Sequence, residues 1–210
     1  MKKLLLLACI PVLFIFSGCG QKEDDDFLDD SFFKDEAVKE ITPQEKIDQY
    51  KEILEIDPDD YQVRNNLAVV YAQLKLFDEA IAELKKVIEL KPEYTTAWLN
   101  LGCSYGDMGK TKQAIDSFLK VIALKPDYPK AHQNLGVAYF KIEDYENAVK
   151  IFEKYNELKK GNLDEGTLSI IAECYKKLAD HDNAVKYYKK ILEINPNNES
   201  IKSELQNMDK

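Results

Sequence analysis

The sequence predicts an all-α protein in which helix pairs repeat along the chain and stack into a solenoid. Three observations predict it. The sequence matches itself after a shift of 34 residues, and apolar side chains within each copy fall at helical spacing on one face. A proline recurs at the same step, as Pro58, Pro92 and Pro126. One helix pair cannot bury its apolar face alone, so neighbouring copies must pack on each other.

Four copies of a two-helix unit are expected, over residues 61–94, 95–128, 129–162 and 165–198. In the second copy, Gly109 breaks the first helix and Lys125-Pro126 ends the second, because proline restricts the residue before it. Small residues recur where paired helices approach closely: Ala68 with Ala80, Gly102 with Ala114, Gly136 with Ala148, and Ala172 with Ala184.

The third copy ends differently from the others. Lys160 stands where the proline is expected, and a two-residue insertion follows it. We therefore expect a looser joint here, with the fourth repeat rotated away from the regular superhelix.

Both ends of the array carry the signals of capping helices. Thr42-Pro43-Gln44-Glu45 is a capping box with proline at the first helical position, which predicts an N-terminal cap within residues 43–60 whose helix runs to Ile56. Residues 199–210 place Ile201, Leu205 and Met208 on one face and predict a C-terminal cap. Such caps solvate the open ends of a solenoid.

The first 18 residues have the layout of a secretion signal. Lys2-Lys3 precede an apolar run from Leu4 to Phe16, which is too short to cross a bilayer core of about 30 Å. Phe16-Ser17-Gly18-Cys19 resembles a bacterial lipobox, although that family usually has Leu at the position of Phe16. The resemblance implies cleavage before Cys19 and acylation of its sulfur and new amine. The alternative is an ordinary secretory signal with an accidental cysteine.

Residues 19–42 are expected to be an acidic, largely flexible tether. The run from Gly20 to Asp26 reads as a solvated spacer, and it also resembles an export tract that some Gram-negative lineages use for surface lipoproteins. Phe27, Leu28, Phe32 and Phe33 could dock on the solenoid or lie on a membrane. We expect a lipid-anchored protein of the bacterial cell envelope, attached to the outer membrane. Whether it faces the periplasm or the cell surface stays open.

Charge and motifs argue against nucleic acid as a partner and against catalysis. The formal net charge is −9, and Arg64 is the single arginine. Gly109-Lys110-Thr111 matches the end of a phosphate-binding loop, but the required earlier glycine is Ser104 and the stretch joins two helices. We expect no enzyme activity, cofactor or metal site. His132 is expected to pack between helices, and a pH- or metal-sensitive role for His181 stays open.

The cysteines predict no redox or zinc chemistry. Cys9 lies in the apolar leader, and Cys103 and Cys174 form no C-x-x-C pair. We interpret Cys103 and Cys174 as small buried apolar residues and not as a mutual disulfide.

The pattern Trp98-x-x-Leu101-Gly102-x-x-Tyr105, followed by Ala114, Phe118 and Pro126, resembles the tetratricopeptide repeat (TPR). The resemblance covers residues 61–198. It implies a right-handed superhelix in which the first helix of each pair lines a concave groove. Carried over residue by residue, it implies that a partner contacts Asn65, Val69, Leu99, Cys103, Gln133, Val137, Phe140, Lys141 and Lys176. That lining would be an apolar strip running into a lysine-rich end.

The leading functional hypothesis is a lipid-anchored scaffold whose groove holds a protein or peptide with apolar anchors and an acidic end. Two alternatives stay open: a self-associating structural envelope protein, and a binder of glycan or peptidoglycan fragments. The apolar groove residues Val69, Val137 and Phe140 can equally be read as completing the core.

Overall fold

The computed structural model describes residues 41–208, so the expected leader, Cys19 and nearly all of the acidic tether lie outside the described residues. Within residues 41–208 every regular element is an α-helix. The helices are α1 (Pro43–Ile56), α2 (Tyr61–Gln73), α3 (Phe77–Leu90), α4 (Thr95–Asp107), α5 (Thr111–Leu124), α6 (Pro129–Lys141), α7 (Tyr145–Leu158), α8 (Glu165–Lys177), α9 (His181–Ile194) and α10 (Glu199–Met208).

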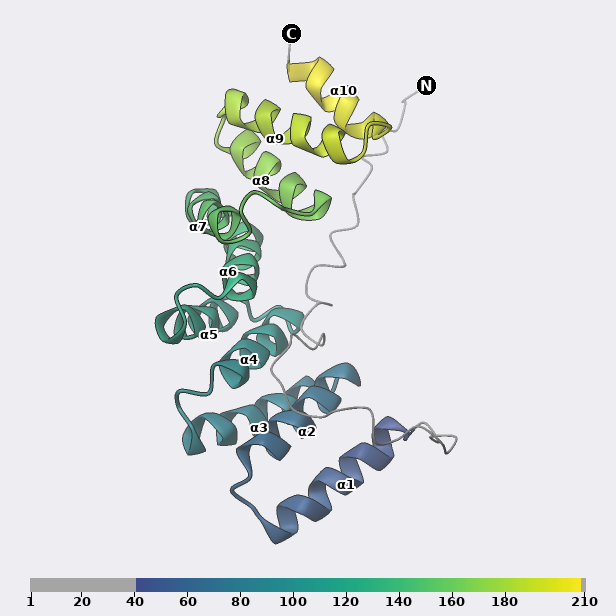
Figure 1. Cartoon of the computed structure of the whole chain (residues 1–210), viewed down its shortest axis with the longest axis vertical. Helices are drawn as coiled ribbons and strands as arrows, with labels where there is room; N and C mark the ends of the chain where they lie inside the picture. Colours follow the sequence, from purple (N-terminus) through teal and green to yellow (C-terminus); the bar gives the residue numbers. More distant parts are fainter. Residues whose placement is uncertain (1–40, 209–210) are drawn as a thin grey trace, which may run out of the picture.

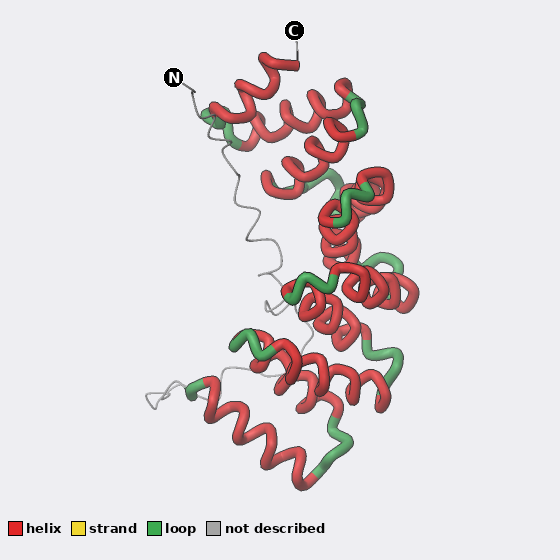
Figure 2. Tube along the Cα trace, turned by 180° about the vertical axis from the view of Figure 1, so that it is seen from behind, coloured by secondary structure: helices red, strands yellow, loops and turns green. Residues whose placement is uncertain are grey.

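The helices pack as consecutive pairs: α2 with α3, α4 with α5, α6 with α7, and α8 with α9. Each pair packs on the next, and α1 and α10 cover the two ends of a curved stack (Figure 1). The view from behind shows the same single row of pairs joined by short turns (Figure 2). The predicted all-α stack of helix pairs is confirmed. None of the helices in residues 41–208 combines the length and apolarity that a bilayer crossing needs.

Close approach within each pair explains the small residues. Ala68, Ala80, Ala114 and Ala148 have no exposed surface. At Gly102 an added Cβ would lie 2.4 Å from Cε1 of Phe118, so only glycine lets this ring pack against the helix backbone. The small residues predicted at these positions are therefore placed where two helices touch.

The turn inside each pair uses one residue with positive φ. Gly109 has φ +73°, as expected for a residue that breaks a helix. The same place is taken by Lys75, Glu143 and Ala179, with φ between +58° and +62°. Three of the four repeats thus accept the cost of a side chain in the left-handed region.

The turn between pairs is held by a side chain that reaches back to the proline carbonyl. Trp98 Nε1 donates to Pro92 O at 2.8 Å, and His132 Nε2 lies 2.7 Å from Pro126 O. Arg64 makes the same contact with Pro58 O through Nε at 2.9 Å. His132 is 4% exposed, which confirms that it packs between helices.

The N-terminal cap forms as predicted. Thr42 Oγ1 accepts from the backbone N–H of Glu45 at 3.2 Å, and Glu45 Oε2 accepts from the backbone N–H of Thr42 at 2.8 Å. Ile47 is buried against Leu67 and Val70 of α2. The reciprocal cap and this apolar contact together position α1 over the first repeat.

The joint before the fourth repeat is built without proline. Lys160 and Gly161 both have positive φ, and Leu163 buries its side chain at 4% exposure. Asp164 then caps α8 by accepting from the backbone N–H of Thr167 at 2.8 Å. The interface between α7 and α8 is smaller than those between α3 and α4 or between α5 and α6, as expected for a looser joint.

Candidate functional site

The concave face of the stack is formed by the first helix of each pair. In Figure 1, α2, α4 and α6 lie toward the inside of the bend, and α3, α5 and α7 lie toward the outside. Neighbouring inner helices α2, α4, α6 and α8 approach each other directly, whereas no two of the outer helices α3, α5, α7 and α9 do so. We define the concave face as the inner surfaces of α2, α4, α6 and α8.

Side-chain hydrogen bonds tie these inner helices together. Asn100 Nδ2 donates to Asn65 Oδ1 at 3.1 Å, which joins α4 to α2. Gln133 Nε2 donates to Thr167 Oγ1 at 3.2 Å, which joins α6 to α8. Each amide uses only part of its hydrogen-bonding capacity in these contacts, so donors and acceptors are left along the concave face.

The nine residues implied to contact a partner all lie on these four helices, but at different depths. The buried ones are Asn65, Leu99, Cys103 and Val137, each below 8% exposure. The half-buried ones are Val69, Gln133, Phe140 and Lys176, and Lys141 is exposed. A partner would contact the half-buried residues and the exposed Lys141, while the buried residues form the floor of the concave face.

Phe140 lies beside Tyr145, at the start of α7. Their rings meet edge to face, with centroids 5.9 Å apart and planes at 61°. This contact orients the Phe140 ring. A half-buried, oriented aromatic ring is the kind of side chain that dominates binding in protein interfaces.

The lysine-rich end of the concave face is not purely basic. Lys176 Nζ lies 3.0 Å from Glu204 Oε2 of α10 and 3.5 Å from Glu173 Oε2. Although burial opposes its charge, the hydrogen bond to Glu204 and the charge of Glu173 raise the pKa of Lys176. The lysine-rich end expected from the sequence is therefore partly neutralised by the acid that α10 brings to Lys176.

Asp107 and Lys141 are charged groups near the ends of α4 and α6. Burial raises the pKa of Asp107 and lowers the pKa of Lys141, while their mutual attraction opposes both shifts. The Asp107 and Lys141 side chains are both exposed, so this pair of opposite charges lies where a polar ligand can reach it.

In the part of the chain that the structure describes, the remaining cysteines and the acidic and histidine side chains form no metal-binding cluster. Burial raises the pKa of the Cys174 thiol to about 12, which makes it unreactive. Cys174 is free, so it is not bonded to Cys103, but Cys103 is disulfide-bonded and is not the plain apolar residue that we expected. Among residues 41–208, no three His, Cys, Asp or Glu side chains are arranged to hold a metal ion.

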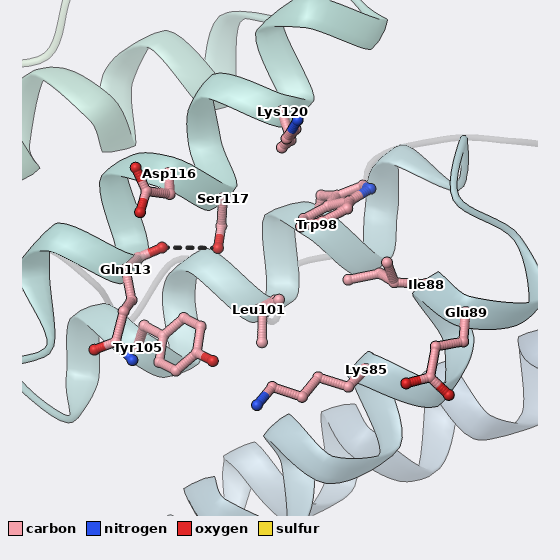
Figure 3. Close-up of a pocket in the computed structure, with 10 residues that line it drawn as sticks. All are labelled: Lys85, Ile88, Glu89, Trp98, Leu101, Tyr105, Gln113, Asp116, Ser117 and Lys120. Carbon is pink, nitrogen blue, oxygen red and sulfur yellow. Dashed lines mark hydrogen bonds between the residues drawn. The ribbon is translucent and has the colours of Figure 1, made fainter.

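A cavity of about 370 Å³ lies away from the concave face, between α3, α4 and α5 (Figure 3). Trp98, Leu101 and Tyr105 of α4 line it, on the side of the helix opposite to Leu99 and Cys103. The other lining residues are Lys85, Ile88, Glu89, Gln113, Asp116, Ser117 and Lys120. Trp98, Leu101 and Tyr105 are part of the repeat pattern, and that pattern gives no sign of a cavity beside them.

Comparison with known families identifies the repeat. Models described as "Tetratricopeptide repeat" match residues 47–102, 129–162 and 167–198, and one described as "TPR repeat" matches residues 104–143. A crystal structure of MamA protein is 30% identical, with a TM-score of 0.67 over 72% of this chain and 81% of that one. This chain is a tetratricopeptide repeat protein.

Two further solved structures share the TPR fold at lower identity. YrrB is 20% identical over 74% of this TPR protein and 79% of its own chain, with a TM-score of 0.67. PilF of Pseudomonas aeruginosa is 22% identical over 77% and 72%, with a TM-score of 0.65. Among curated proteins, no sequence matches this chain. TPR proteins are typically non-enzymatic scaffolds that bind protein or peptide partners.

Proposed function

We propose that this TPR protein is a lipid-anchored scaffold of the bacterial cell envelope that holds a segment of a protein partner along its concave face. The observation that carries the proposal is the row of inner helices, which combines half-buried apolar side chains with amides that keep free hydrogen-bonding capacity. YrrB, a relative in fold, is described as a TPR protein with an unusual peptide-binding site.

The chemistry of the concave face suits a peptide better than a rigid globular surface. Val69 and Phe140 offer apolar contacts on α2 and α6, and the Gln133 amide lies on α6, where it donates to Thr167 of α8. An extended or helical segment buries alternate apolar side chains and presents polar groups to such amides. Glu173 and Glu204 accompany Lys176, and Asp107 attracts Lys141, so an acidic group of the partner would meet lysines that already have acidic neighbours.

Photo-crosslinking from single positions tests this assignment. A benzophenone amino acid at Gln133, on the concave face, should crosslink a partner in cells that produce the full chain. The same group at Lys150, exposed on α7, is the matched control and should crosslink far less. Equal crosslinking from both positions, or crosslinking from Lys150 alone, would refute binding at the concave face. Crosslinks to a second copy of the chain would indicate self-association in its place.

The lipid anchor is proposed from the sequence around Cys19. Several acyl chains, each contributing about 0.8 kcal/mol per buried methylene, would hold the protein on a membrane, whereas one chain would not. Cys19→Ala should move the protein from the membrane fraction to the supernatant, and Cys9→Ala should not. Mass spectrometry of the membrane-bound protein should find diacylglyceryl on Cys19. A Cys19→Ala variant that stays with membranes would exclude this anchor.

A further inference from the structure

The cavity between α3, α4 and α5 has an apolar interior and a charged rim. Trp98, Leu101 and Ile88 supply the apolar wall, and the four charged residues of the lining surround its mouth (Figure 3). Within residues 41–208, none of the four (Lys85, Glu89, Asp116 and Lys120) has an ion pair within 4.0 Å. The rim charges are therefore available to a ligand.

In the fourth repeat, an aromatic side chain occupies the position that corresponds to the cavity of the second repeat. The repeat register aligns Tyr105 with Tyr175 and Ser117 with Tyr187. Tyr187 stacks on Tyr175, with centroids 5.6 Å apart and planes at 20°. Its side chain is 5% exposed. The second repeat keeps the tyrosine platform and has only the small Ser117 where the fourth has a ring, so the space of one aromatic side chain is left open.

The lysine that accompanies the ring is also retained. Lys190 Nζ lies 5.0 Å from the centroid of the Tyr187 ring, within the range of a cation–π contact. The register aligns Lys190 with Lys120, which lines the cavity in the second repeat. An aromatic ring entering the cavity would thus meet a tyrosine face and a lysine, as Tyr187 does.

The charged residue next to the tyrosine has opposite signs in the two repeats. In the fourth repeat, Tyr175 donates its hydroxyl to Glu153 Oε1 at 3.0 Å. The register aligns Glu153 with Lys85, whose side chain extends toward Tyr105 in Figure 3. The Tyr105 hydroxyl can donate or accept a hydrogen bond, but the Lys85 ammonium can only donate, so this end of the cavity lacks the carboxylate that the fourth repeat has. A ligand with a carboxylate beside its ring would supply it.

We propose that this cavity binds an aromatic side chain from an acidic segment of a protein partner, with the ring stacked on Tyr105 and the neighbouring carboxylate next to Lys85. The site lies on the other side of α4 from the concave face, so it goes beyond the proposed function. It gives the scaffold a second point of attachment on its outer side.

Trp98 is the single tryptophan of the chain, so one indole N–H resonance in the NMR spectrum reports on the cavity. The probe is an acetylated, amidated peptide with the sequence Asp-Asp-Phe-Asp-Asp, added to the whole protein. We expect a saturable shift of the Trp98 resonance. The same peptide with Ala in place of Phe should give none, and an equal shift with that peptide would overturn the proposal.

Two variants test the two halves of the inference. Ser117→Tyr copies the fourth repeat, fills the cavity and should weaken binding at least about tenfold. Ser203→Tyr, exposed on α10, is the matched control and should bind normally. Lys85→Glu, an exposed position that leaves the fold intact, should weaken the acidic peptide about three- to tenfold and favour a Lys-Lys-Phe-Lys-Lys peptide. Unchanged affinity in Lys85→Glu would overturn the acidic preference, and unchanged affinity in a folded Ser117→Tyr would overturn the site.

Discussion

The first three repeats and the fourth are entered in different ways. Each of the first three follows a proline whose carbonyl accepts a hydrogen bond from a side chain six residues later; the donors are Arg64, Trp98 and His132. At the fourth repeat, Lys160 replaces the proline and Leu168 replaces the donor. The two changes occur together, which indicates that proline and donor act as one unit that orients the next helix.

The fourth repeat is positioned by other means. Leu163 is buried in the insertion, and Asp164 caps α8 through Thr167. Glu165 then accepts from Asn198 Nδ2 at 2.8 Å, which ties the start of α8 to the turn before α10. A repeat can therefore lose the proline and its hydrogen-bond donor and still dock, provided that an apolar side chain and a helix cap replace the hydrogen bond.

Leu163→Ala should have the largest effect, because the fourth repeat depends on this side chain. Removing a buried leucine side chain costs about 2–5 kcal/mol of unfolding free energy. We expect the loss to be local, so hydrogen exchange should accelerate in α8 to α10 and not in α1 to α4. Uniform acceleration along the whole chain would contradict a separate role for this joint.

Gly102→Ala tests the tight helix contact of the regular repeats. The new Cβ would clash with Phe118, so we expect a net loss of about 1–2 kcal/mol in urea unfolding, after the better helix propensity of Ala is counted. The first repeat has Ala68 and Leu84 at these two positions. Gly102→Ala combined with Phe118→Leu should therefore lose less than the sum of the single changes. Strict additivity would argue against the clash.

His132→Leu copies the fourth repeat into the third and removes the hydrogen bond to Pro126. We expect the unfolding free energy to fall by about 1 kcal/mol, the usual net value of one hydrogen bond. His132→Trp copies the second repeat and should be at least as stable as the native chain, because within residues 41–208 the buried His132 Nδ1 has no hydrogen-bond partner. A His132→Leu variant of native stability would show that proline alone orients the helix.

Ala179→Gly should have the smallest effect and should stabilise the protein. Ala179 has φ +58°, a region that costs an L-residue about 1–2 kcal/mol, part of which is offset by the greater chain entropy of glycine. We expect a gain of about 0.5–1 kcal/mol in thermal unfolding. Gly109→Ala, at the same place in the second repeat, should give a loss of similar size.

The regular part of the fold could be predicted because its signals are local. The 34-residue step, the small residues at helix contacts and the capping box at Thr42 each depend on a short stretch of sequence. Helical phase also placed the candidate contact residues on the inner helices. Helical phase could not predict how deeply each of these side chains is buried, because burial depends on how closely neighbouring inner helices approach. Val137, for example, is only 2% exposed because the adjacent helices cover it.

Two features of the surface could not be predicted. The pairing of Lys176 with Glu204 joins residues 28 apart through the docking of α10, which no local pattern describes. The cavity beside Trp98 arises from a missing side chain, because Ser117 stands where the fourth repeat has Tyr187. An absence of this kind produces no motif and becomes visible only when the repeats are compared in space.

Hydroxyl-radical footprinting of the protein with its crosslinked partner tests the central claim most directly. If the concave face holds the partner, Phe140 should be protected from oxidation in the complex, whereas Leu119, which is 42% exposed on the outer helix α5, should react as it does in the free protein. Protection of Leu119 with no change at Phe140 would contradict the claim.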